Sequence, residues 1–114
     1  MKRLIQHIPV LQYIRTLNSL EQKKLLLNAP KQLLITLSEI ALNLIQRNIS
    51  LTGTQISKLK KFEKEIVQLS AKKHSLNKRK KILRKGTFFK SLLDSTVPSL
   101  MVSLARSKTK NVQQ

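Results

Sequence analysis

The chain has 114 residues and a net charge of +18, with no cysteine, two glycines and three prolines. The length suggests one small domain, and the missing cysteines exclude a disulfide framework or a thiolate metal site. No uncharged apolar run approaches the ~20 residues of a membrane span, and Gln6, His7 and Pro9 interrupt the apolar residues near the basic N-terminus, so we expect neither an ordinary transmembrane helix nor a signal peptide.

The first half of the chain predicts three short helices, because helix-forming residues dominate it and its apolar residues recur at helical spacing. A first helix is expected over residues 9–18, with its proline at the first position, where the missing N–H is harmless. A second helix is expected over residues 19–28, opened by a capping box of Ser19 and Gln22. The third, over residues 30–46, has the widest apolar face and is the expected central core helix.

The second half continues the helical pattern with a more basic composition. A fourth helix is expected over residues 53–72, after a capping box formed by Thr52 and Gln55, with apolar residues on one side and lysines on the other. A fifth is expected over residues 76–85, capped by Ser75 and ended by a glycine in the left-handed conformation. With one more helix at the C-terminus, the sequence predicts an all-α protein, a small bundle of five or six short helices.

The last helix is expected over residues 88–106, with a break at Pro98 as an alternative. Its apolar face either packs against the core helix at residues 30–46, which the sequence favours, or lies on an anionic membrane or a partner beside the polybasic run. The tail after it is expected to be disordered. The residues of the apolar face are Phe88, Phe89, Leu92, Leu93, Val97, Leu100, Met101 and Leu104.

Charge is distributed unevenly along the chain. Residues 54–90 carry thirteen cations and two anions, so this third of the chain holds +11 of the net charge of +18. Clustering of one sign is typical of a binding surface. The predicted organisation therefore has four parts: a helical core over residues 1–71, a polybasic segment over 72–86, an amphipathic C-terminal helix over 87–106 and a disordered tail over 107–114.

The polybasic segment holds eight cations and no acid between Lys72 and Lys85. Like charges at this density repel one another, so the segment is expected to bind a polyanion, and the phosphate backbone of nucleic acid is the usual one. Since Asn77 is its only amide and lysine outnumbers arginine, we expect contacts to phosphate without base specificity. The expected phosphate-binding residues are Lys72, Lys73, Lys78, Arg79, Lys80, Lys81, Arg84 and Lys85, with Lys58, Lys61 and Lys64 extending the surface.

Catalytic and metal-binding chemistry is not expected. The chain has five carboxylates, and the two closest, Glu63 and Glu65, are two residues apart on a predicted helix and do not face each other. His7 and His74 are far apart in sequence, and neither has a partner at a metal-ligand spacing. The sequence therefore predicts no enzyme, no cofactor and no metal site.

Two other classes of function are open alternatives. In one, the protein is membrane-active or lies inside a capsid, its C-terminal helix acts, and its lysines bind anionic lipid. In the other, it is an adaptor whose basic face docks an acidic protein. The same basic run also fits a nuclear import signal.

The chain contains four short motifs, at Ile40–Asn43 (Ile-Ala-Leu-Asn), at Arg47–Thr52 (Arg-Asn-Ile-x-Leu-Thr), at Leu69–Lys78 and at Lys85–Phe88. Together they resemble a lysine-rich protein family encoded in Maverick/Polinton-like elements and in adintovirus- and adomavirus-like viruses. The resemblance covers about residues 20–105. Thr87 departs from the second glycine of the family's Lys-Gly-Gly-Phe motif.

The order of a basic run, a glycine and an amphipathic apolar tail, over about residues 78–105, is also similar to the precursor of the adenovirus minor core protein mu. That likeness implies a DNA-condensing protein of a virion core, located in the host nucleus or the virion interior, with DNA favoured over RNA. The cations here are mostly lysine, whereas the adenoviral peptide is arginine-rich. No diglycine processing site is present, so the likeness does not extend to proteolytic maturation.

Overall fold

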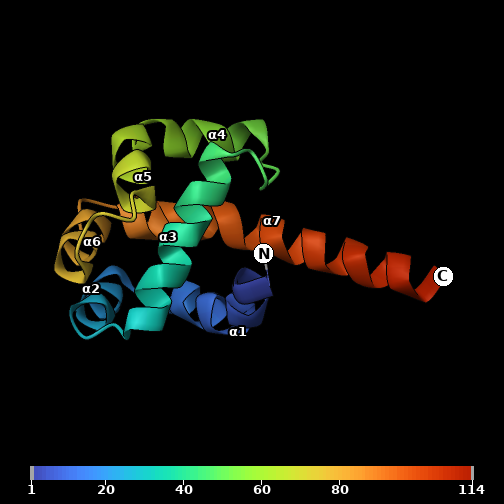
Figure 1. The fold of residues 1–114 in the computed structure, drawn as a ribbon, viewed down its shortest axis with the longest axis horizontal. Helices are drawn as coiled ribbons and strands as arrows, with labels where there is room; N and C mark the ends of the chain where they lie inside the picture. Colours follow the sequence, from blue (N-terminus) through green and yellow to red (C-terminus); the bar gives the residue numbers. More distant parts are fainter. Residues whose placement is uncertain (1, 114) are drawn as a thin grey trace.

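The all-α class expected from the sequence is confirmed by a computed structural model, which describes the backbone of residues 2–113 and the side chains of residues 3–106. Within that range the chain forms seven helices and no strand (Figure 1). The helices are α1 (Lys2–Thr16), α2 (Ser19–Leu27), α3 (Lys31–Ile45), α4 (Gly53–Lys60), α5 (Glu63–Ser70), α6 (Leu76–Leu83) and α7 (Phe88–Gln113).

Helix α1 begins well before the expected start at residue 9, so that Pro9 lies inside it. Leu4 and Ile8 precede the proline and are buried together with Leu11 and Ile14, which follow it. Their spacing continues one helical face across the proline. Burial of the two preceding side chains contributes about 1.5 to 3 kcal/mol each, which offsets the cost of roughly 3 kcal/mol for an internal proline.

The capping box of α2 is shifted by one residue from its expected position. The N-cap is Asn18 rather than Ser19: the Asn18 side-chain oxygen accepts the Glu21 N–H at 2.8 Å, and the Glu21 carboxylate accepts the Asn18 N–H at 3.1 Å. Asparagine caps as well as serine, and Glu21 also faces the positive end of the helix dipole. The box expected at Thr52 and Gln55 is present as the start of α4.

Replacing Asn18 with alanine is expected to lower the free energy of unfolding by about 1 kcal/mol, because the Glu21 N–H loses its acceptor. Replacing Ser19, whose exposed hydroxyl makes no hydrogen bond within the described part of the chain, is expected to change it by less than about 0.5 kcal/mol. Urea denaturation followed by far-UV circular dichroism measures both. Equal losses of stability in the two variants would show that Asn18 is not the N-cap of α2.

Helix α3 is the central helix, as its wide apolar face predicts. Leu34, Leu37 and Ile40 are completely buried, and the helix packs against α5, α1 and α6. In Figure 1 it crosses the front of the molecule, with α1 and α2 near its beginning and α4 and α5 near its end. The helix starts directly after Pro30, the N-cap residue, and it ends at Ile45.

The prediction of a single helix over residues 53–72 is wrong. The chain turns at Lys61 and Phe62 and forms two helices instead. The Phe62 N–H bonds to the Leu59 carbonyl at 2.9 Å, and Phe62 has φ −106° and ψ 17°, so α4 ends and α5 starts in a new direction (Figure 1). The turn lets α4 pack on α7 while α5 packs on α3. It also places the Phe62 ring 5.3 Å from the ring of Phe88.

The hydrophobic core extends beyond residue 71, the expected end of the helical core. One cluster of buried residues runs from Leu4 to Leu100 and includes Ile82 and Leu83 of α6 and the inner face of α7. The expected boundary at residue 71 therefore does not divide the core. The polybasic segment is a helix anchored in this core rather than an appended arm.

Helix α7 passes through Pro98 without a break, and its backbone is helical as far as Gln113. Val97 and Leu100, on either side of the proline, are buried, so packing holds the helix together there as it does in α1. The tail expected to be disordered from residue 107 continues the helix, and Gln114 lies outside the described residues. The end of α7 projects from the bundle (Figure 1). The molecule as a whole extends over 45 × 29 × 26 Å.

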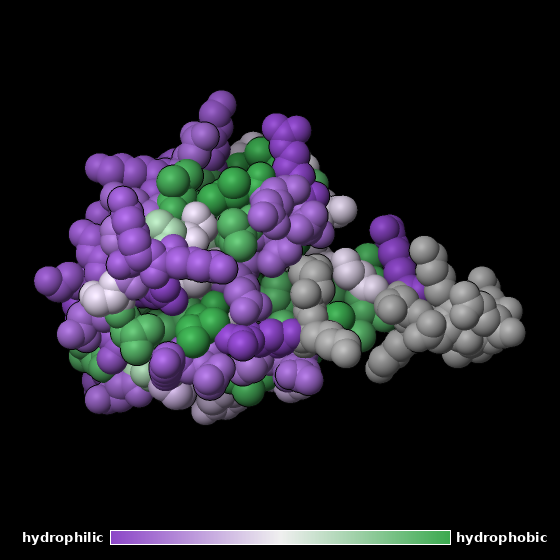
Figure 2. Space-filling view, viewed as in Figure 1, coloured by the Kyte–Doolittle hydropathy of each residue, from purple (hydrophilic) through white to green (hydrophobic). Residues whose placement is uncertain are grey.

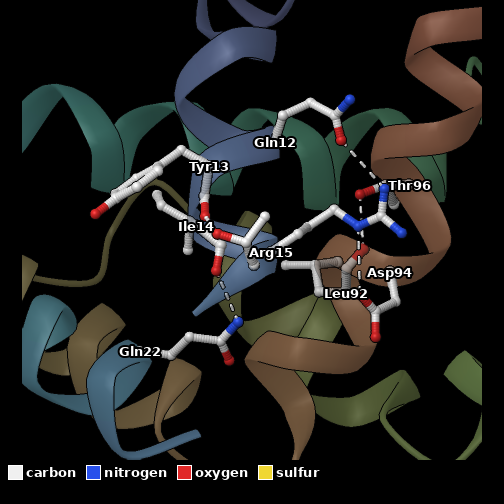
Figure 3. A network of polar contacts seen from close by, with 9 residues as sticks. Gln12, Tyr13, Ile14, Arg15, Gln22, Leu92, Asp94 and Thr96 are labelled. Atoms are coloured by element: carbon white, nitrogen blue, oxygen red, sulfur yellow. Dashed lines mark hydrogen bonds and ion pairs between the residues drawn. The ribbon is translucent and has the colours of Figure 1, made fainter. Parts of the chain in front are cut away.

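A small polar network connects α1 to α7 and to α2 (Figure 3). The Arg15 guanidinium donates to the Asp94 carboxylate at 3.3 Å and to the Gln12 side chain at 3.3 Å. The side chain of Gln22, 3% exposed, donates to the Ile14 carbonyl at 3.0 Å. The bond of Gln22 satisfies a buried polar side chain, whereas Arg15 and Asp94 remain partly exposed.

Candidate nucleic-acid interface

Helix α6 carries the densest part of the basic run; it begins where the sequence predicts, at Leu76, and ends two residues earlier than expected, at Leu83, with Arg84 as its C-cap. The Ser75 hydroxyl accepts the Lys78 N–H at 3.2 Å and caps the N-terminus. Gly86, at φ +50°, follows the helix in the left-handed conformation. Since the first turn contains no acid, the helix dipole does not favour this composition. Burial of Ile82 and Leu83 in the core is what holds the helix in place.

The eleven predicted phosphate-binding residues differ in their exposure to solvent and fall into three groups. Lys80 and Arg84 are half-buried, and Arg79 is buried. The remaining eight point into solvent, and Lys78 and Lys81 lie one turn apart on the outer face of α6. The exposed residues are Lys58, Lys61, Lys64, Lys72, Lys73, Lys78, Lys81 and Lys85.

Arg79 and Lys80 make contacts within the protein. The Arg79 side chain is 9% exposed, and its Nη2 donates to the Lys72 carbonyl at 3.2 Å. The Lys80 ammonium donates at 3.0 Å to the carbonyl of Leu27, the last residue of α2, where a cation complements the negative end of the helix dipole. The outer surface of α6 is therefore formed mainly by Lys78 and Lys81, the exposed neighbours of these two residues.

The lysines of α4 and α5 lie beside this surface rather than within it. Figure 1 places α5 between α4 and α6, and Figure 2 shows hydrophilic side chains over the margin formed by these helices. Lys58, Lys61 and Lys64 are exposed, and the Lys61 ammonium lies 5.1 Å from the centre of the Phe62 ring. They add exposed cations along the outside of the bundle.

None of the described acids forms an ion pair with the polybasic segment. Glu39 pairs with Arg3 at 3.4 Å, and Asp94 pairs with Arg15 at 3.3 Å. Glu21 is used in the capping box of α2. No described ion pair thus neutralises the charge of the polybasic segment, and Glu63 and Glu65, on the preceding helix α5, form no ion pair with it.

Two further cations, which are not among the predicted phosphate-binding residues, join the polybasic segment in space. Lys23 of α2 and Lys90 of α7 line a hollow of about 20 Å³ together with Arg84 and Gly86. The hollow lies between α2 and the turn from α6 to α7. Lys23 is remote from the run in sequence, and only the packing of α2 on α6 and α7 brings it there.

The apolar residues of α7 mostly lie in the core. Six of the eight predicted residues are buried, Leu104 is half-buried, and Met101 is 39% exposed. The helix packs mainly on α1 and α4 rather than on α3, the expected neighbour. Among the described helices no single one is long and apolar enough to span a membrane; α2 and α3 meet that test only as a pair bent by 115°.

No group of three or more metal-ligating side chains occurs among the described residues. His7 lies on α1 with its Nδ1 2.8 Å from the Arg3 carbonyl oxygen, and His74 lies in the turn before α6. Fold and surface together define an all-α protein that displays a polybasic helix on a continuous hydrophobic core. Comparison with protein-family models, curated proteins and solved structures finds no match.

Proposed function

We propose that this protein binds nucleic acid without sequence specificity, through the exposed cations of the polybasic segment and of α4 and α5. One observation carries the proposal: the lysines of α6 are held outward on an anchored helix, and no described acid neutralises them. A fixed array of uncompensated cations releases the counterions of a phosphate backbone when it binds, and this release provides the affinity. Lysine contributes charge rather than base recognition, so phosphate contacts dominate.

The biological setting belongs to the same proposal. The resemblance to lysine-rich proteins of Maverick/Polinton-like elements, and the similarity of residues 78–105 to the adenovirus mu precursor, support condensing or packaging of the DNA of a virus or mobile element. Such a protein would act in the host nucleus or the virion interior, on DNA rather than RNA. A chain of +18 neutralises phosphate charge efficiently for its size.

The salt dependence of binding tests the proposal. If about five cations contact duplex DNA, the slope of log K against log salt concentration is expected to be about −4 to −5. Fluorescence anisotropy with labelled duplexes of two unrelated sequences measures the slope, and the two affinities are expected to agree. A slope near zero, or a strong preference for one sequence, would contradict the proposal. A duplex RNA measured in parallel decides between DNA and RNA.

The membrane-active alternative makes a different demand on the protein. Phe88, Leu92 and Leu93 are completely buried, so α7 would have to leave the core before its apolar face could meet lipid. Dye release from anionic vesicles measures this activity directly. Leakage caused by the folded protein, with DNA binding absent, would favour the membrane function over the one proposed here.

A further inference from the structure

A groove of about 460 Å³ lies between α3, the end of α5 and α6, on a different side of α6 from the exposed lysines. One wall is formed by Lys31, Ile35, Ser38 and Leu42, which recur every three or four residues and therefore lie in one line along α3. The volume falls within the usual range of ligand-binding sites. Figure 2 shows apolar side chains over the course of α3 on this face, bordered by hydrophilic ones.

Arg79 lines this groove and lacks a counterion. Its side chain is 9% exposed, its Nη2 donates to the Lys72 carbonyl, and its Nε is buried without any hydrogen-bond partner. Of the described side chains it is the only buried cation, and it forms no ion pair with a described acid. A guanidinium removed from water without an acidic partner is costly, and a carboxylate or phosphate reaching it would remove that cost.

The groove contains more cations than acids. Arg3, Lys31 and Lys72 also line it, and the single acid there, Glu39, is paired with Arg3 at 3.4 Å. Lys31, Lys72 and Arg79 therefore have no described acid to balance them. The groove favours an occupant with negative charge.

The groove is apolar as well as cationic, which narrows the kind of occupant. Ile35, Leu42 and Leu76 line it between the cations, and all three are only half-buried in the free protein. A phosphate backbone would leave these aliphatic side chains in contact with strongly hydrated groups. A segment that alternates carboxylates with aliphatic side chains would satisfy both features. Apolar anchors with charged neighbours are the usual arrangement of helix-in-groove recognition.

We propose that this groove docks a short acidic peptide segment of a partner protein, with aliphatic side chains on Ile35, Leu42 and Leu76 and a carboxylate on Arg79. The line from Lys31 to Leu42 is about 16 Å long, which corresponds to three turns of a helix or about five residues of extended chain. The proposal goes beyond nucleic-acid binding and does not depend on it. The protein would hold nucleic acid on the outside of α6 and a protein partner on α3.

Fluorescence anisotropy with two labelled peptides tests the docking site. The first is an acidic peptide of about three helical turns, with leucines at positions i, i+4 and i+7 and glutamates elsewhere; the second has serines in place of the leucines. We expect the leucine peptide to bind at least about tenfold more tightly than the serine peptide, because only the former buries apolar surface. Equal affinities would reduce the interaction to general charge attraction and overturn the proposal.

Two variants and one matched control locate the binding. R79M keeps the aliphatic stem but removes the charge, and I35S keeps the charge but removes an apolar contact. Each is expected to weaken binding of the leucine peptide about tenfold or more. K81M likewise replaces a cation with methionine, but on the exposed face of α6, and it is expected to change peptide binding by less than about twofold. Thermal melts confirm that each variant is folded, and I35S decides the outcome if R79M is not.

Other occupants of the groove would give other results. If R79M weakens binding of a duplex while K81M does not, and peptide binding is unaffected, the groove is part of the nucleic-acid surface and the peptide proposal is wrong. If phosphatidylserine vesicles displace the leucine peptide and the serine peptide equally, the groove recognises anionic lipid instead. If the lysines on the outside of α6 are removed and duplex binding is lost while peptide binding persists, the two functions are separate, as proposed.

Discussion

Truncating Phe88 to alanine is expected to lower the free energy of unfolding by about 3 to 5 kcal/mol, a large part of the roughly 5 to 15 kcal/mol that stabilises a typical domain. Phe88 is completely buried at the start of α7, and its ring lies 5.3 Å from the ring of Phe62. The substitution leaves a cavity where α7 meets the turn between α4 and α5, and it removes the contact between the two rings. Urea denaturation followed by circular dichroism measures the loss.

Met101 provides the matched control on the same helix. It is 39% exposed, so M101A is expected to lower the free energy of unfolding by less than about 1 kcal/mol. A small effect at Phe88, similar to that at Met101, would mean that α7 is not docked in the core. The membrane-active alternative would then gain support, because the apolar face of α7 would be available to lipid.

The local features of the fold were predictable from the sequence because the residues that cause them are adjacent in the chain. Ser75 caps α6, Gly86 adopts a left-handed conformation after it, and Thr52 and Gln55 form a capping box, all as expected. Each involves side chains and amides within one turn, so no knowledge of tertiary contacts is needed. The one-residue shift at Asn18 is an error of the same local kind: two good N-cap residues are neighbours.

The tertiary features were not predictable in the same way. Pro9 favours a helix start, yet burial of Leu4 and Ile8 continues the helix through it. The turn at Phe62 has no glycine or proline to signal it. It exists because α4 and α5 pack on different neighbours. In each case contacts remote in sequence outweigh the local preference.

The binding surface likewise combines a local feature that the sequence predicts with tertiary features that it does not. The concentration of cations in α6 is a property of the sequence, but the burial of Arg79 follows from the helical phase set by Ile82 and Leu83. Lys23 joins the surface only through the packing of α2. The groove along α3 could not be foreseen, since it requires α3, α5 and α6 together and uses residues outside the predicted apolar face of α3.

Removing the charge of Lys78, Lys81 and Lys85 together, by substitution with glutamine, is expected to weaken binding to duplex DNA about five-hundredfold at 0.1 M salt. Each phosphate contact contributes about 0.9 to the slope of log K against log salt, so the slope is expected to fall in magnitude by about 2.7. All three side chains are exposed and none forms an ion pair with a described acid, so the fold is expected to be unaffected. Anisotropy titrations over a range of salt concentrations measure both quantities.

A second triple variant separates a defined surface from net charge alone. Substitution of Lys24, Arg47 and Arg106 with glutamine removes the same charge from three exposed positions on other parts of the chain. If phosphate contacts are concentrated on α6, this variant is expected to change the slope by less than about one contact, or 0.9. If both triples reduce the slope equally, binding depends on the overall charge of +18, and α6 has no special role. The comparison is decisive because long-range attraction depends on total charge, whereas the slope depends on the phosphates that are neutralised.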